Sequence, residues 1–170
     1  DAPLIPDEEA IAAIHGKFVD GVDLVLGVGS GVINDLCKYV SFDRGLPYYI
    51  VATAPSMDGY ASATSSVTRD GLKISLNSKC ANVVIGDIDI LKNAPLHMLK
   101  SGLGDMIAKY VSICEWRISN IITGEYYCEK VAALVRKALN KCVSNAKGLL
   151  ACDEQAVKAV FEGLIIGGVA

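Results

Sequence analysis

The sequence has no long apolar run, no block of like charges and no cysteine pair at CxxC spacing. A membrane-spanning helix needs about 20 consecutive apolar residues, whereas the apolar runs here are short and interrupted by Gly, Asp or Lys. Since no leader segment opens the sequence either, we expect a soluble, cytoplasmic protein without a membrane partner. Scattered lysines and arginines with a net charge of -3 predict no nucleic-acid partner.

Cysteine and histidine are present without the spacings typical of metal motifs. Most of the six cysteines lie among apolar helical positions, which favours reduced, packed thiols over three disulfides. The two histidines, His15 and His97, have no HxxxH or HxxE partner, so they are expected at the surface or in packing contacts.

The residues that are present indicate a folded, well-packed protein. Apolar residues make up 52% and charged residues 21% of 170 residues, enough for one domain or for a domain and part of another. The final stretch, "FEGLIIGGVA", stops inside a helical pattern without a C-cap. We therefore expect the chain to be a fragment of a longer protein.

The first half has the pattern of a parallel α/β unit. "PDEEAIAAIHGKF" predicts a short helix, and "VDLVLGVG" predicts a strand buried on both faces. An amphipathic helix and a second buried strand at 48–53 follow. Asp70-Gly71 between β-prone arms predicts a hairpin, and 82–89 predicts another strand.

The second half is expected to be helical. Pro95 predicts a helix start and Ser101 an N-cap for a further helix, whose apolar repeat is Leu103, Ile107, Val111 and Cys114. The predicted fold class is α/β: a parallel-sheet nucleotide-binding domain at 1–92, followed by a truncated all-helical domain at 93–170.

A glycine-rich turn, "GVGSG", joins the first strand to its helix. Such a turn exposes backbone N–H groups at a helix N-terminus, where a phosphate is favoured. The spacing is GxGxG and not the GxGxxG of the dinucleotide fingerprint, and no acidic residue follows at the usual distance. Spacing alone leaves a structural bend and a phosphate site equally open.

Two further stretches contain residues suited to chemistry. "TAPSMDGYAS", residues 53–62, follows the second strand, where ligands of parallel sheets bind, although a polar turn capped by Asp58 also fits. In "SGLGDMIAKY", residues 101–110, Asp105 and Lys109 have the i,i+4 spacing of an ordinary surface ion pair.

Together, "GVGSGVINDLCKY", "IVATAPSMDGYAS", "IGDIDIL" and "SGLGDMIAKYVSICEWRIS" resemble the metal-dependent polyol dehydrogenases, a family with glycerol dehydrogenase, iron-containing alcohol dehydrogenases and dehydroquinate synthase. Within it the likeness is greatest to the sn-glycerol-1-phosphate dehydrogenases. The resemblance covers essentially the whole chain. It implies an enzyme that uses NAD or NADP and one divalent metal, which would be zinc, nickel or iron.

The resemblance also implies roles for particular residues. Asp58 and Asp105 would contact the substrate as catalytic residues, and Asp105 would bind the metal. The family's two histidine ligands would lie beyond Ala170, and its first strand and early cofactor-binding acid are missing here. The cofactor would be held by the glycine turn and by three hydroxyl residues: Gly29, Ser30, Gly31, Val32, Ile33, Thr53, Ser56 and Ser62.

The implied reaction is hydride transfer to dihydroxyacetone phosphate, giving sn-glycerol 1-phosphate, in a homo-oligomer. Alternatives are a dehydrogenase of glycerol or another polyol, a lyase like dehydroquinate synthase, and a nucleotide-binding module without catalysis. With only one of its metal ligands present, the 170-residue chain alone is expected neither to hold metal tightly nor to turn over substrate.

Overall fold

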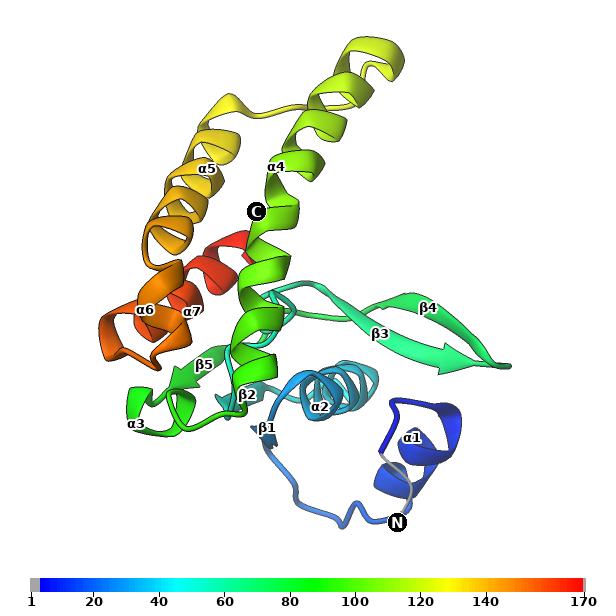
Figure 1. Cartoon of the computed structure of the whole chain (residues 1–170). Coiled ribbons are helices and arrows are strands. Elements are labelled where there is room, and N and C mark those ends of the chain that lie inside the picture. Colours follow the sequence, from blue (N-terminus) through cyan, green and yellow to red (C-terminus); the bar gives the residue numbers. More distant parts are fainter. Residues whose placement is uncertain (1–3, 170) are drawn as a thin grey trace. The chain divides into compact units, whose positions relative to one another are not determined.

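The computed structural model describes residues 4–169, which form two compact units (Figure 1). The first unit contains the chain up to Thr53 together with Gly59–Asp87, and the second contains Ala54–Asp58 and the chain from Ile88 onward. The predicted fold class is confirmed, because a parallel sheet precedes a helical region. The domain limits at 92 and 93 stay a prediction.

The first unit contains a parallel sheet with strand order β1-β2-β5 and an antiparallel pair, β3-β4. In the parallel sheet, Gly27 is paired with Ile50, and Ile50 is paired in turn with Val84. The elements of this unit are α1 (Glu8–His15), β1 (Val25–Gly29), α2 (Gly31–Asp43), β2 (Tyr48–Ala52), β3 (Thr64–Arg69), β4 (Leu72–Asn77) and β5 (Val83–Gly86).

Strand β1 is covered on one face only, so the prediction of a strand buried on both faces is wrong. Leu26 and Val28 are 55% and 59% exposed. Gly27 and Gly29, which alternate with them, are buried on the other face, where a Cβ on Gly29 would lie only 2.7 Å from Ile33 of α2. A continuous apolar run cannot distinguish these cases, because glycine hides the alternation between faces.

The β3-β4 hairpin has the predicted turn. Asp70 and Gly71 are the only residues between the paired positions Arg69 and Leu72, and their φ angles are 51° and 76°. Two successive positive φ values are typical of a type I′ turn, for which Asp-Gly is a preferred sequence. The hairpin prediction is confirmed.

The second unit is helical and is built around one long helix. Its elements are α3 (Ile88–Leu91), α4 (Leu96–Thr123), α5 (Glu129–Ser144), α6 (Ala146–Leu150) and α7 (Glu154–Val169). Helix α4 begins after Pro95, as predicted, but continues through Ser101 without a break. The prediction that Ser101 caps a separate helix is therefore wrong.

The buried face of α4 also differs from the expected one. Leu99, Met106 and Ile113 are buried, whereas Ile107 and Val111 are 48% and 61% exposed. The buried face of α4 is therefore turned by about one residue, or roughly 100°, from the predicted apolar repeat. Both α5 and α7 pack against α4 and against each other.

Within residues 4–169, no helix is both long and apolar enough to cross a membrane. The cysteines are free thiols, and Cys142 is buried between α5 and α7, where its Sγ lies 3.4 Å from the carbonyl oxygen of Ala159. Burial raises the pKa of Cys142 to about 11. His97 is exposed, and His15 Nδ1 accepts a hydrogen bond from Arg44 Nε at 3.1 Å, as expected for surface and packing roles.

We expect Gly163→Ala to destabilise the helical unit, because the new Cβ would lie 2.4 Å from Cys142 Sγ. Overpacking of this kind costs about 1–3 kcal/mol. Gly104 is the matched control: it also lies inside a helix, but its Cβ would meet nothing within 4 Å. Gly104→Ala should raise the free energy of unfolding by at most about 1 kcal/mol. Urea unfolding measures both changes, and equal effects would contradict this packing contact.

Candidate active site

Two acidic residues predicted to share a site are in contact in the second unit. Asp58 is in the short segment after β2, and its backbone N–H donates a hydrogen bond to Asp105 Oδ2 at 3.3 Å. Asp105 is in the third turn of α4 and is partly buried. The structure therefore brings together residues that are 47 positions apart in the sequence.

The approach of the 54–58 segment to α4 depends on a glycine. A Cβ on Gly102 would lie 1.9 Å from the carbonyl oxygen of Pro55, which no side chain could tolerate. Pro55 and Ser56 are buried at this contact, and Asp105 is one turn further along α4. Gly102 thus permits the backbone approach that sets Asp58 beside Asp105.

Lys109 forms an ion pair with Asp58 Oδ2, from the next turn of α4. The sequence suggested a surface ion pair between Lys109 and Asp105. The structure instead shows Lys109 paired with Asp58, and neither side chain is fully exposed. The Lys109 and Asp58 side chains are 21% and 31% exposed, so the pair is largely screened from solvent. The Lys109 ammonium group offsets the negative charge of the Asp58 carboxylate.

The glycine turn lies in the first unit, where β1 ends and α2 begins. Gly29 is the last residue of β1, Ser30 is the N-cap of α2, and Gly31 opens a helix of 13 residues. Val32 and Ile33 complete its first turn. The first N–H groups of a helix have no partner within it, so this end of α2 can hold an anion. The close contact of Gly29 with Ile33 also gives this glycine a packing role.

The hydroxyl residues predicted to contact the cofactor fall in both units. The N–H of Thr53 donates to Gly29 O at 3.1 Å, so Thr53 lies directly beside the glycine turn. Ser62 is also in the first unit, and its hydroxyl accepts a hydrogen bond from Lys38 Nζ at 2.9 Å. Ser56 is grouped with the second unit and is 8% exposed. Their cofactor contacts stay predictions.

Two polar residues of α2 were missed from the sequence. Asn34 and Lys38 are both fully buried and both contact the 59–62 segment. Their four-residue spacing places them on one helix face, and Ser41 extends this polar row. A polar row usually marks a solvent-exposed face, so nothing in the spacing distinguished this buried row.

The carboxylates do not form a complete metal centre by themselves. In the part of the chain that the structure describes, no three His, Cys, Asp or Glu side chains are grouped so as to hold a metal. Catalytic zinc sites use three protein ligands. Asp105 and Asp58 could therefore provide only part of such a ligand set.

The fold and the paired acids define an α/β protein with a helical extension that carries a candidate polar site. Residues 4–95 match the iron-containing alcohol dehydrogenase family. Because this match covers more than half of the chain, the protein belongs to that family.

The chain is similar to curated relatives over nearly all of its length. It is 34% identical over 167 residues to "Glycerol-1-phosphate dehydrogenase [NAD(P)+]" of Halalkalibacterium halodurans, a match that covers 98% of this chain and 42% of the relative. A relative of the same name from Thermococcus sibiricus is 35% identical over 151 residues, covering 89% of this chain and 43% of the relative. The chain thus spans about two fifths of these relatives.

Solved structures share the fold at lower identity. A probable glycerol dehydrogenase from Sinorhizobium meliloti matches 98% of this chain and 50% of its own, with a TM-score of 0.84 and 23% identity. Glycerol dehydrogenase from Schizosaccharomyces pombe matches with a TM-score of 0.76 and 24% identity, over 98% of this chain and 46% of its own. These likenesses establish the fold.

We expect Gly102→Ala to displace the 54–58 segment from α4, because its Cβ would overlap Pro55 O. The Asp58 amide should lose its hydrogen bond to Asp105, and its hydrogen exchange should accelerate at least about tenfold. Exchange measured by NMR or mass spectrometry on Gly102→Ala and on the Gly104→Ala control tests this. Unchanged protection at Asp58 in Gly102→Ala would rule out the proposed role of the glycine.

Proposed function

We propose that this chain belongs to an NAD(P)-dependent, metal-dependent dehydrogenase that reduces dihydroxyacetone phosphate to sn-glycerol 1-phosphate. The observation that carries the proposal is the contact between two acidic residues. The backbone N–H of Asp58, on the segment that follows β2, donates a hydrogen bond to the Asp105 carboxylate on α4. The names of the relatives, which match along nearly the whole chain, support the reaction and the cofactor.

The cofactor is proposed to bind the first unit at the end of β1. Its pyrophosphate would accept hydrogen bonds from the free N–H groups of the first turn of α2, residues 31–33. Ser30 and Gly29 form the turn that leads into this helix. Thr53 and Ser62 would contribute hydroxyl contacts from the same unit.

The substrate is proposed to bind at the carboxylates of the second unit. Asp58 can accept a hydrogen bond from a substrate hydroxyl group, while its Oδ2 forms the ion pair with Lys109. This arrangement orients a small polyol or ketone by fixed polar contacts. Hydride transfer itself is the chemistry of the nicotinamide cofactor, so these residues bind and orient the acceptor.

Asp105 fits as one ligand of a divalent metal, because its carboxylate is carried on a long helix and contacts the backbone of a second acidic residue, Asp58. When bound, such a metal acts as a Lewis acid that polarises the substrate oxygen. The described residues contain no cluster of three ligand side chains, so the proposal needs metal ligands in addition to Asp105 and Asp58.

Asp105→Asn should abolish most dehydrogenase activity in the longest natural form of the protein that contains this chain. The amide keeps the shape of the side chain but removes the charge that holds the metal, so kcat/KM should fall by about 100-fold or more. The assay follows NADH or NADPH oxidation with dihydroxyacetone phosphate. The control is Asp153→Asn. Asp153 is exposed and precedes α7, where its Oδ1 accepts a hydrogen bond from the N–H of Ala156.

The same assay tests the substrate class. Oxidation of sn-glycerol 1-phosphate should proceed with a higher kcat/KM than oxidation of glycerol. A preference for glycerol would contradict the phosphorylated substrate while leaving the dehydrogenase class intact. Turnover without net release of reduced cofactor would instead favour a lyase.

The 170-residue chain alone should bind zinc weakly and lack turnover, because one carboxylate pair supplies too few ligands. Isothermal titration with Zn²⁺ should give a dissociation constant at least about 100-fold weaker than that of the longest natural form. Stoichiometric tight binding and activity in the 170-residue chain would refute this.

A further inference from the structure

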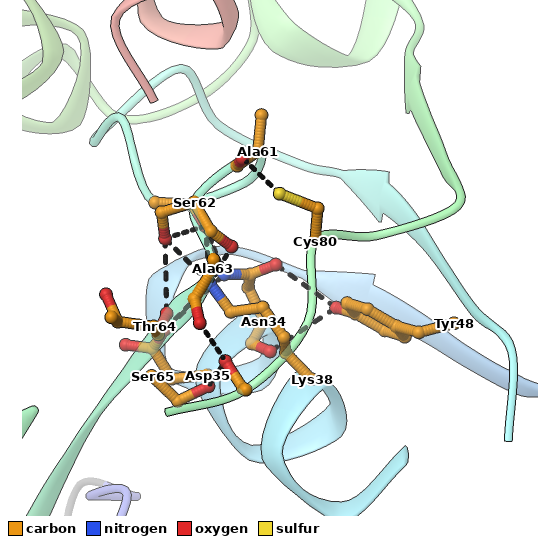
Figure 2. A network of polar contacts seen from close by, with 12 residues as sticks. Asn34, Asp35, Lys38, Tyr48, Ala61, Ser62, Ala63, Thr64, Ser65 and Cys80 are labelled. Carbon is orange, nitrogen blue, oxygen red and sulfur yellow. Dashed lines mark hydrogen bonds and ion pairs between the residues drawn. The ribbon is translucent and has the colours of Figure 1, made fainter. Parts of the chain in front are cut away.

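The ammonium group of Lys38 is buried at the centre of a polar network in the first unit (Figure 2). Its side chain is 0% exposed. Nζ donates to Gly59 O at 2.7 Å, to Ser62 Oγ at 2.9 Å and to Ser62 O at 3.3 Å. An ammonium group has three donors, so the 59–62 segment supplies an acceptor for each.

The carboxylate nearest to this ammonium is that of Asp35, whose Oδ1 is 3.8 Å from Nζ. The closest contacts of Lys38 are therefore with neutral oxygens of the 59–62 segment. Burial raises the pKa of Asp35, although the charge of Lys38 and the N–H of Ser66 act in the opposite direction. A buried charge is tolerated only where it is well paired. Lys38 therefore depends on the geometry of the 59–62 segment, and the segment depends on the hydrogen bonds that Lys38 donates.

Asn34 strengthens the same attachment from one turn earlier in α2. Its Nδ2 donates to Gly59 O at 3.1 Å, and Ser62 Oγ lies 3.1 Å from the same carbonyl. On its other side, Asn34 Oδ1 accepts from the Tyr48 hydroxyl at 3.2 Å. Tyr48 belongs to β2, so the network ties the 59–62 segment to both α2 and the parallel sheet.

We infer that Lys38 is a positioning residue for the proposed cofactor site, an inference that rests on the proposed function. It fixes the segment directly after Asp58 by satisfying the carbonyls of Gly59 and Ser62. It also donates to one lone pair of the Ser62 hydroxyl oxygen, so the second lone pair can accept a hydrogen bond from a ligand.

The 59–62 segment is attached to the same helix, α2, that carries the proposed pyrophosphate site. The N-terminal turn of α2 is the proposed pyrophosphate site, and Asn34 and Lys38 lie on the following two turns of the same helix. One rigid helix therefore sets the anion-binding amides and the Ser62 hydroxyl at fixed distances from each other. A cofactor that uses both would meet them already arranged, which lowers the ordering cost of binding.

Lys38→Met tests the inference, since it keeps an unbranched side chain of nearly the same length and removes the ammonium. In the 170-residue chain, hydrogen exchange of residues 59–65 should accelerate at least tenfold, while the amides of β1 and β2 keep their protection. The dissociation constant for NADH, measured by fluorescence titration, should rise at least tenfold. Lys79→Met, at an exposed lysine of the same unit, should change neither quantity.

Ser62→Ala gives an independent measurement if Lys38→Met does not fold. It removes one of the three acceptors, so exchange of residues 59–65 should accelerate by a smaller factor. Unchanged exchange there, or an acceleration spread evenly over β1 and β2, would overturn the positioning role. Normal NADH affinity in a folded Lys38→Met chain would overturn it as well. Absence of NADH binding by the wild-type chain would count against the proposed cofactor site, while the exchange result would still decide whether Lys38 holds the segment.

Discussion

The candidate site depends on the path of ten residues, 53–62, between β2 and β3. Two contacts of different kinds set this path. Gly102 has no side chain, so the backbone of Pro55 can lie against α4. Lys38 does the opposite, because its long side chain reaches the carbonyls of Gly59 and Ser62. In the sequence, Asp58 lies between Pro55 and Gly59, the nearest residues of these two attachments.

Both contacts act on backbone carbonyl groups, and this limits the substitutions that each can accept. A carbonyl of the 54–58 segment occupies the space of a Cβ on Gly102, so any other residue there must move the backbone. The carbonyls near Lys38 accept hydrogen bonds from its ammonium group, which is buried and needs acceptors. The sequence of the segment itself is less constrained by these contacts than the two residues that hold it.

Much of the architecture could be predicted from local patterns, because those patterns report local physics. The Asp70-Gly71 turn needs two positive φ values, and few other dipeptides provide them at low cost. The buried face of α4 could not be predicted, since its apolar residues continue around the helix: Met106 and Ile107 are neighbours, yet only the first is buried. The same limit applies to β1, where glycines conceal which face is covered.

The site residues divide in the same way. Asp58 follows a predicted strand and Asp105 lies early in a predicted helix, but their proximity depends on Gly102, which in the sequence looks like a mild helix breaker. Lys38 looked like an ordinary polar helix residue, although a buried lysine that is matched by three acceptors is a costly arrangement to build. These acceptors belong to the segment that follows Asp58 in the sequence. Gly102 and Lys38 are therefore harder to recognise in the sequence than the two acids, although each of them contacts the backbone of residues 53–62.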